Sequence, residues 1–485
     1  MSSHPIAPTA APSRGSASVA RRLSESACTT PGLDGFLRRL HSARQSQYTL
    51  TERVPLDRLD GWEYDPGQGA LVHHSGRFFS VVGLRVEAPE QPEPAWHQPI
   101  IDQPEVGLLG FLAKEFDGVL HFLTQLKAEP GNRNGIQLSP TVQATRSNYT
   151  GVHGGSRVPY LEFFQETGPH RVIADVRQSE QGDWFLRKRN RNMVVETTRD
   201  VSVRDGFVWL TLGQLHQLLG VDDLVNMDSR SVLGCLPVPH GHRSPAVDDG
   251  TFRAALLRSS APDAPTAHSM TDLLSWITDA RIRSGLVARQ VPLAGLPAWR
   301  ETDGRISHHS GRYFDVIGVR VEAVGREVGR WCQPMITARA DGLLAFLVTR
   351  VDGVLHVLMH IRAEPGLTDV AELAPTVQCF PHDHAQLPPS AQPPFLERVL
   401  GAAPDAVRFD TVLSDEGGRF HHTGSRHVVV ETKWLRPPAD YRWMTLRQLG
   451  DLVQHSHYLN MQARSLLACL RSLETEQDSP PGGTR

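Results

Sequence analysis

A run of adjacent polar residues offers the chemical groups that bind a phosphorylated or hydroxylated ligand. Thr145-Arg146-Ser147-Asn148-Tyr149 supplies hydrogen-bond donors, acceptors and one fixed positive charge. A flexible, glycine-rich stretch follows it at residues 151–155. The run is therefore a candidate ligand loop, and a polar turn that covers the end of a strand is the alternative.

Two further groups of charged residues could line a pocket. Lys127 and Glu129 are two positions apart in a predicted strand, which places both side chains on one face. Such a pair is typical of a solvated face, but it is well placed for chemistry if that face lines a pocket. A basic run at residues 187–192 either binds phosphate or faces water. Within it, Arg191 is predicted to be structural because it has a counterpart, Arg426, elsewhere in the chain.

The elements that must position these residues occur twice in the chain. The segment at residues 73–197 recurs at residues 308–432 with a constant offset of 235 and no net insertion. The strings HHSGR, DGVLH, AEPG and PTVQ are among those that return. A constant offset over this length indicates two modules with one backbone. Differences between the copies then point to function.

Each module is predicted to begin with strands and to end with helices, which indicates an α+β fold. Apolar runs and apolar–polar alternation predict strands at residues 78–87, 119–128 and 193–197, with partners at 313–322, 354–363 and 428–432. Helical spacing opens the modules near Leu33 and Leu273. Two helices close the first module, one over 211–219 with Thr211 as N-cap and Gly220 as stop, the other over about 226–236.

Composition divides the 485 residues into two modules with proline-rich or polar segments around them. We expect a disordered tail at 1–30, a first module at 31–236, a linker at 237–268, a second module at 269–474 and a disordered tail at 475–485. Five cysteines without a close pair, and no signal peptide, fit a reducing cytoplasm. The net charge of −3 favours neither nucleic acid nor a membrane as partner, and no apolar run approaches the ~20 residues that span a bilayer.

Several enzyme classes are disfavoured by the motifs that the sequence lacks. No Walker loop, GxSxG elbow, HExxH or GxGxxG sequence precedes a suitable helix. Cys379, His382 and His384 have a compact spacing that could suit a metal ion. The first copy has other residue types at these places, and no second ligand pair stands at zinc-site spacing. We therefore expect no metal site.

The chain resembles the NDP-hexose 2,3-dehydratases, enzymes that make 2-deoxysugars for glycosylated natural products such as antibiotics. The resemblance covers about residues 33–473, which includes both modules and the linker. It rests on long and unusual strings: DGVLHFLTQLKAEPGN at 117, LSPTVQATRSNYTGVHGG at 138, FLRKRNRNMVVE at 185, and in the second copy WCQPMI and LAPTVQC.

The resemblance implies two tandem Nudix-like modules, arising from an internal duplication, in a homodimer whose nucleotide sites need no metal. The implied substrate is dTDP-4-keto-6-deoxyglucose. Its 4-keto group acidifies the hydrogen on carbon 3, so a base can remove that proton while the hydroxyl on carbon 2 leaves. The enol then tautomerises to a 3,4-diketo-2,6-dideoxy sugar. Nothing is oxidised overall, so we expect no cofactor.

The resemblance also suggests roles for residues of the first copy. We expect Trp62 to contact the nucleotide base, and Thr145, Arg146, Ser147, Asn148 and Tyr149 to hold the diphosphate and sugar. Tyr149 is the candidate proton carrier and Lys127 the candidate stabiliser of the enolate. These last two roles are hypotheses from residue type and position.

The second copy differs from the first at the ligand run, where Phe380 and Pro381 replace a threonine and an arginine. We therefore expect it to hold a remnant nucleotide pocket that uses Trp299 and Gln378. The reverse assignment stays open, because the second copy has acid–base groups of its own at residues 382–384.

Two other functions compete with dehydration. One is a non-catalytic protein that binds a nucleotide sugar, and the polar runs at 145–149 and 187–192 argue against it because a scaffold need not keep them. The other is Nudix-type hydrolysis, which the absence of the metal-binding glutamates of that motif disfavours. Because a 3,4-diketo sugar is labile, a 3-ketoreductase is expected to act directly after this protein.

Overall fold

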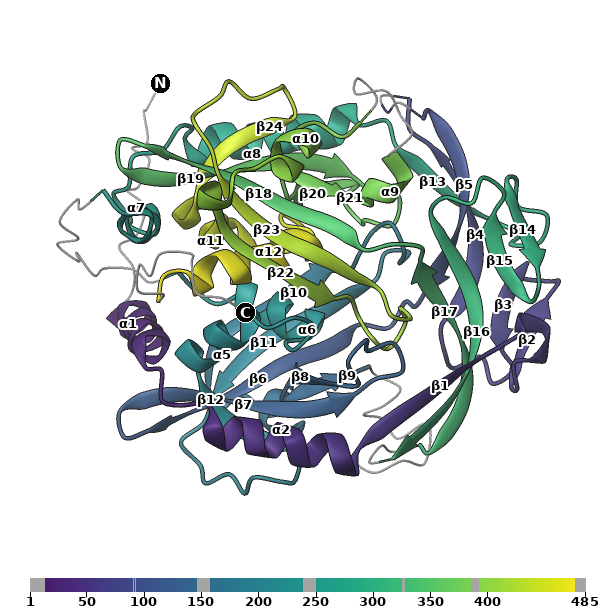
Figure 1. The fold of residues 1–485 in the computed structure, drawn as a ribbon, viewed down its shortest axis with the longest axis horizontal. Helices are drawn as coiled ribbons and strands as arrows, with labels where there is room; N and C mark the ends of the chain where they lie inside the picture. The colour runs from purple at the N-terminus through teal and green to yellow at the C-terminus, as the bar shows by residue number, and fades with distance from the viewer. Residues whose placement is uncertain are drawn as a thin grey trace, which may run out of the picture.

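The computed structural model describes residues 14–89, 91, 93–145, 158–238, 250–324, 328–384 and 392–475, and Figure 1 shows it as a ribbon. It has mixed α and β structure in two similar halves, each rich in β-sheet. Each half contributes one seven-stranded and most of one five-stranded sheet. In the described part of the chain no helix is long and apolar enough to cross a membrane.

The two seven-stranded sheets have the same mixed topology. In the first half the order is β10-β11-β6-β7-β12, with β8 paired to β7 and β9 to β6; in the second it is β22-β23-β18-β19-β20, with β21 paired to β18 and β24 to β19. Strands β6 and β11 run parallel, as do β18 and β23, and the other pairs are antiparallel. The bounds in the first half are β6 (Gly107–Phe116), β7 (Val119–Ala128), β8 (Ile136–Pro140), β9 (Val142–Ala144), β10 (Arg171–Ser179), β11 (Arg189–Glu196) and β12 (Phe207–Thr211). Those in the second are β18 (Gly342–Val351), β19 (Val354–Ala363), β20 (Ala371–Ala374), β21 (Val377–Cys379), β22 (Val407–Ser414), β23 (Gly424–Glu431) and β24 (Tyr441–Thr445).

Helices that begin at side-chain caps lie between the two large sheets (Figure 1). They are α5 (Leu212–Leu219) and α6 (Met227–Gly234) in the first half, and α11 (Leu446–Val453) and α12 (Met461–Ser472) in the second. Thr211 caps α5 and Gly220 ends it, while Asn226 caps α6, so both predicted helices are confirmed. The outer helices are α1 (Arg14–Cys28), α2 (Asp34–Ser46), α7 (Phe252–Ser259) and α8 (Met270–Arg283), and the short ones are α4 (Glu162–Gln165), α9 (Pro381–His384), α10 (Leu396–Leu400), η1 (Leu56–Arg58) and η3 (Pro404–Ala406).

The two five-stranded sheets each contain one strand from the other half. Strand β1 (Tyr48–Val54) follows α2 in the first half but pairs with β16 (Phe314–Val324) of the second. Reciprocally, β13 (Val287–Val291) pairs with β4 (Ser80–Glu87) of the first half, as Figure 1 shows. The remaining strands are β2 (Trp62–Asp65), β3 (Ala70–His73) and β5 (Ala95–Asp102), and β14 (Trp299–Thr302), β15 (Arg305–His308) and β17 (Arg330–Ala338). The halves are thus joined by an exchange of strands.

A reciprocal pair of buried arginines ties the halves together where α6 packs against α12. Arg230 donates from Nε to Ser465 Oγ at 2.7 Å and from Nη2 to the carbonyl of Ser414 at 2.7 Å. Arg464 donates in the same way to Ser231 Oγ at 3.1 Å and to the carbonyl of Ser179 at 2.6 Å. Each guanidinium lies almost fully out of solvent but is hydrogen-bonded across the interface, which offsets the cost of burying it.

The structure differs from the sequence prediction in two segments for which we expected disorder or a linker. Helix α1 lies inside the predicted N-terminal tail, and α7 lies inside the predicted linker. Each has a serine in its last turn that binds the sheet: Ser26 Oγ donates to the carbonyl of Leu120 and accepts from the N–H of Leu212. Ser259 repeats both contacts in the second half. Composition alone suggested disorder because it ignores the helical spacing of the buried Ala20, Leu23 and Ala27.

Candidate active site

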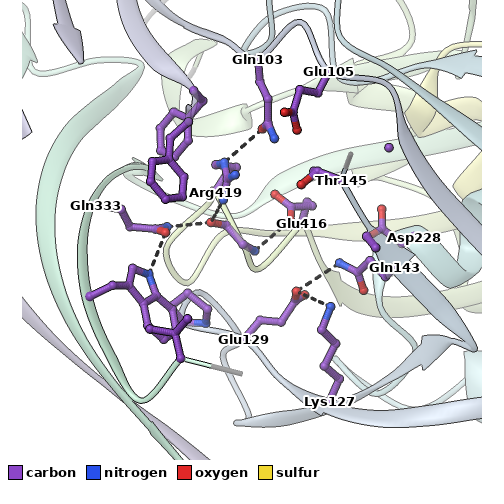
Figure 2. Close-up of a pocket in the computed structure, with 18 of the residues that line it drawn as sticks. Gln103, Glu105, Lys127, Glu129, Gln143, Thr145, Asp228, Gln333, Glu416 and Arg419 are labelled. Carbon is purple, nitrogen blue, oxygen red and sulfur yellow. Dashed lines mark hydrogen bonds and ion pairs between the residues drawn. The ribbon is translucent and has the colours of Figure 1, made fainter. Parts of the chain in front are cut away.

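A cavity of about 980 Å3 lies against the large sheet of the first half and is closed by the second half. Its first-half wall comes from β6, β7 and β9, from the segment between β10 and β11, and from β2, β3 and the loop between β3 and β4. Its second-half wall comes from β17 and from the loop between β22 and β23. Figure 2 shows the side chains from both halves facing one another across this space. A ligand here would contact both copies of the repeat.

Strand β7 carries a charged pair into the cavity. Lys127 Nζ lies 3.2 Å from Glu129 Oε1, and both residues line the space. Gln143 from β9 donates to the same carboxylate at 3.1 Å, and Asn226, the N-cap of α6, donates to Gln143 Oε1 at 3.2 Å. The face predicted to bear Lys127 and Glu129 therefore lines a pocket, with the carboxylate held in place by an amide.

Trp62 lines the cavity at the start of β2, and its side chain is buried. Its indole N–H donates to the carbonyl of Cys332 in the second half at 2.7 Å. Its ring packs against Phe79, with centroids 4.9 Å apart, and edge-on against His73. Because the N–H is already bonded, the ring surface is the part of Trp62 that a ligand could contact.

The loop after β22 places an arginine from the second half in the first-half cavity. Arg419 donates from Nε to Gln103 Oε1 at 3.2 Å, and its guanidinium lies 4.2 Å from the ring centroid of Phe79. Gln333 from β17 holds this loop by donating to the carbonyl of Gly418 at 2.7 Å (Figure 2). A positive charge stacked on an aromatic ring and anchored by an amide is a preorganised partner for an anion.

Buried carboxyl groups with perturbed acidity form the inner wall. Burial raises the pKa of Glu180, and burial together with Glu129 raises the pKa of Glu416 to about 7. Burial raises the pKa of Asp228 well above its ordinary value, and the charges of Glu180 and Glu416 raise it further. Burial lowers the pKa of Lys188 to about 8. Such shifts are typical of groups that exchange protons near neutral pH.

The described side chains of this wall are not arranged as a metal site. Across the described ranges, no three His, Cys, Asp or Glu residues are grouped so as to hold a metal ion.

The corresponding place in the second half is filled by aromatic rings. Trp184, which the repeat aligns with Arg419, stacks on Phe380 with centroids 5.8 Å apart and also contacts Phe314 and Phe420. The charged pair is retained as Arg362 and Glu364 at 3.2 Å. The second-half site therefore keeps the charged pair, but Trp184 and Phe380 lie there in the positions that Arg419 and Thr145 have at the first-half cavity.

A family model described as NDP-hexose 2,3-dehydratase matches the chain twice, at residues 34–236 and 270–470. The chain belongs to the NDP-hexose 2,3-dehydratase family. The two matches begin close to α2 and α8 and end close to α6 and α12, so they follow the repeat seen in the structure.

Three relatives agree along most of the chain, each named dTDP-4-dehydro-6-deoxy-alpha-D-glucopyranose 2,3-dehydratase. The protein from Saccharopolyspora spinosa is 50% identical over 87% of this chain and 88% of its own length. That from Amycolatopsis orientalis is 45% identical over 96% of both chains. That from Streptomyces violaceoruber is 47% identical over 88% of this chain and 94% of its own.

The structure brings together only part of the site predicted from sequence. Lys127, Trp62 and Thr145 line the cavity. Trp299 and Gln378 do not line it, because they belong to the equivalent place in the second half, where Gln378 donates to Glu364 at 2.8 Å. The remaining predicted residues, Arg146, Ser147, Asn148 and Tyr149, lie outside the described residues.

The residues of the basic run lie in two different surroundings. Lys188 is buried and lines the cavity, whereas Arg191 forms a bidentate pair with Asp175 at 2.7 and 2.6 Å on the sheet. Arg426 pairs with Asp410 in the same way, so the structural role of the shared arginine is confirmed.

Sequence reasoning missed Asp228, Glu180, Glu416 and Arg419. Comparison of the copies could have found three of them, since the second half has Gln462 in place of Asp228 and the first has Gln181 and Trp184 in place of Glu416 and Arg419.

Proposed function

We propose that this protein removes water across carbons 2 and 3 of dTDP-4-keto-6-deoxyglucose and yields a 3,4-diketo-2,6-dideoxy sugar nucleotide. The main support is the sequence similarity to 2,3-dehydratases, which extends along nearly the whole chain and includes both halves. The cavity supports it with the groups that this chemistry needs: a cation, carboxyl groups of raised pKa and an aromatic ring.

In this proposal Lys127 stabilises the enolate that forms when the proton on carbon 3 is removed. Its ammonium group lies in the cavity beside Glu129, which holds it in position. A donor aimed at a developing oxyanion contributes roughly 3–4 kcal/mol to the transition state. Tyr149 is the proposed proton carrier, four positions along the chain from Thr145 in the cavity wall.

The nucleotide is proposed to lie along the wall shared by the two halves. Trp62 would contact the base through its ring, and Thr145, Arg146, Ser147 and Asn148 would hold the diphosphate and sugar. Arg419, which bonds Gln103 and stacks on Phe79, lines the same cavity and would face the diphosphate. In the second half, Trp299 and Gln378 would belong to a remnant nucleotide pocket.

Further properties of the protein are proposed on the same basis. Each half is proposed to be a Nudix-like module, for which a mixed sheet with helices against one face is the support. We also propose a cytoplasmic homodimer in deoxysugar biosynthesis for an antibiotic or similar product. Because the diketo product is labile, a 3-ketoreductase would take it up directly.

A deuterium assay tests the proposed reaction. The protein is incubated with dTDP-4-keto-6-deoxyglucose in deuterated buffer containing EDTA, and the sugar is followed by mass spectrometry and NMR. Loss of water with deuterium entering carbon 2 is expected. Binding without any loss of water would contradict the proposal and favour a nucleotide-sugar-binding protein, and cleavage of the diphosphate on addition of magnesium would favour a Nudix-type hydrolase.

A further inference from the structure

A carboxyl group in the cavity wall has no fixed hydrogen-bond partner for one of its oxygens. Asp228 lies in the first turn of α6, is 3% exposed and lines the cavity. Its Oδ1 atom is buried and has no hydrogen-bond partner among the described residues. Burying a carboxyl oxygen without a hydrogen bond costs folding free energy. Such an atom is therefore expected where a bound ligand supplies the missing hydrogen bond or where the carboxyl group is protonated. Figure 2 shows Asp228 on the same side of the cavity as Thr145 and Gln143.

The charges around Asp228 favour its neutral form. Glu180 follows β10, Glu129 follows β7 and Glu416 comes from the second-half loop, and all three disfavour a negative charge on Asp228. Lys127 on β7 and the buried Arg230 on α6 act in the opposite direction. The N-terminus of α6 also favours an anion. Burial is the largest cause of the shift, and together with the three carboxyl groups it raises the pKa of Asp228 well above its ordinary value.

The second half shows that neither the fold nor the helix cap requires this aspartate. The equivalent helix α12 is capped by Asn460 as α6 is by Asn226, yet it has Gln462 where α6 has Asp228. Glu416 is likewise replaced by Gln181 at its equivalent place. Asp228 and Glu416 thus line the first-half cavity, whereas the equivalent place in the second half has two glutamines and the stacked rings of Trp184 and Phe380.

We propose that Asp228 is the general acid that protonates the hydroxyl group leaving carbon 2, an assignment that rests on the proposed dehydration. The base of the reaction takes the proton from carbon 3, and the electrons of that C–H bond form the enolate. The enolate electrons then form the C2–C3 double bond as the C2–O bond breaks, and the departing oxygen takes the proton of Asp228 and leaves as water. Solvent then reprotonates Asp228 and carbon 2, while the enol hydroxyl on carbon 3 and the base each release a proton. One water is released and nothing is oxidised.

Asp228→Asn separates this role from a structural one, because the amide keeps the shape but cannot donate the same proton. In deuterated buffer with EDTA, the variant is expected to lose water about 10²- to 10⁴-fold more slowly than the unchanged protein. It should still exchange the hydrogen on carbon 3 for deuterium, since that step needs only the base and the enolate stabiliser. Asp405→Asn, at an exposed aspartate of η3, is the matched control and should behave as the unchanged protein.

The outcomes are distinct. Full water loss by Asp228→Asn, or equal loss of exchange and dehydration in a variant that melts normally, would overturn the assignment. Activity that EDTA abolishes and magnesium restores would also overturn it, because the carboxyl groups would then serve as metal ligands. Absence of water loss in the unchanged protein would instead contradict the proposed function itself.

A pH profile keeps the proposal testable if Asp228→Asn does not fold. The acid form is the active one, so the rate of water loss is expected to fall as pH rises through the raised pKa of Asp228. Two other groups of the cavity wall could produce a similar fall: Lys188, with a pKa near 8 through burial, and Glu416, with a pKa of about 7 through burial. Lys188→Met and Glu416→Gln should therefore each keep the alkaline fall, and its disappearance in either variant would assign the fall to that residue and overturn the proposal.

Discussion

At the scale of single residues, the internal duplication works as a control within one chain. Both halves keep the charged pair on the central strand, as Lys127–Glu129 and Arg362–Glu364, each at 3.2 Å. A lysine presents a compact, mobile charge, whereas a bidentate arginine is held by its fork geometry. In the second half Arg362 also contacts Asp183, so its guanidinium is occupied by protein carboxylates. The first-half lysine is the better donor to a developing enolate.

Replacing Lys127 with methionine should slow water loss strongly without unfolding the protein. The change removes one donor to the enolate while keeping a flexible side chain of similar length, so kcat should fall roughly 10²- to 10³-fold. Steady-state kinetics with dTDP-4-keto-6-deoxyglucose measure this. The control Lys433→Met, at an exposed lysine, should leave kcat unchanged. Retention of full kcat by Lys127→Met would remove this residue from the mechanism.

At the scale of secondary-structure elements, helix caps and strand patterns in the sequence predicted where individual helices and strands begin and end. The helices with Thr211 and Asn226 as caps lie as predicted, and strands β7 and β19 have the predicted bounds. Asp117-Gly118 forms the predicted tight turn, with φ of 49° and 82°. The partners of the strands could not be read from these signals. Nothing in the alternation of β1 indicates that it pairs with the other half, because period-two patterning specifies a face and not a neighbour.

The part of the candidate site that could be predicted from sequence is the part whose residues are close together in the chain. The pair on β7 follows from spacing along a single strand. Asp228 and Arg419 reach the same cavity from a helix and from a loop of the opposite half. Their approach depends on how the halves pack, which a single sequence does not encode locally.

The glycine of each AEPG string marks the place where loops of the two halves meet. Gly131 N–H donates to the carbonyl of Gly417 at 2.7 Å, and a Cβ at Gly131 would overlap the carbonyl of Phe420. Gly366 makes the equivalent contact with Gly182 at 2.7 Å. The first of these contacts supports the loop that carries Glu416 and Arg419 into the cavity.

Gly131→Ala should therefore destabilise the protein and weaken the site together. Overpacking of this kind costs about 1–3 kcal/mol of the free energy of unfolding. Urea denaturation followed by circular dichroism measures the loss, and kinetics on the folded fraction should show a raised KM as the Arg419 loop shifts. Gly168→Ala, where an added Cβ meets nothing within 4 Å, should be neutral in both. Equal stability of the two variants would contradict the close approach.

At the scale of the whole molecule, the two halves depend on each other for structure. Each five-stranded sheet includes a strand from the opposite half, and Arg230 and Arg464 hydrogen-bond reciprocally across the interface. Separation of the halves would leave strand edges unpaired and would break the hydrogen bonds that the two guanidinium groups make across the interface. Separated halves would also leave the cavity without the wall that the second half supplies.

We expect the halves to unfold in one cooperative transition. Tryptophan fluorescence and circular dichroism, recorded together in urea, should give coincident curves because neither half retains its sheets without the other. Two well-separated transitions would show that the halves are independently stable and would contradict the structural role given to the exchanged strands.

The central claim is that dehydration takes place in the first-half cavity, and one exchange of residues between the halves tests it. Thr145→Phe introduces the residue that fills the equivalent place in the second half, and Phe380→Thr makes the reverse change. The measurement is the rate of water loss from dTDP-4-keto-6-deoxyglucose per folded molecule. Thr145→Phe should abolish it and Phe380→Thr should leave it intact. Turnover retained by Thr145→Phe and lost by Phe380→Thr would place the reaction in the second half and contradict this account.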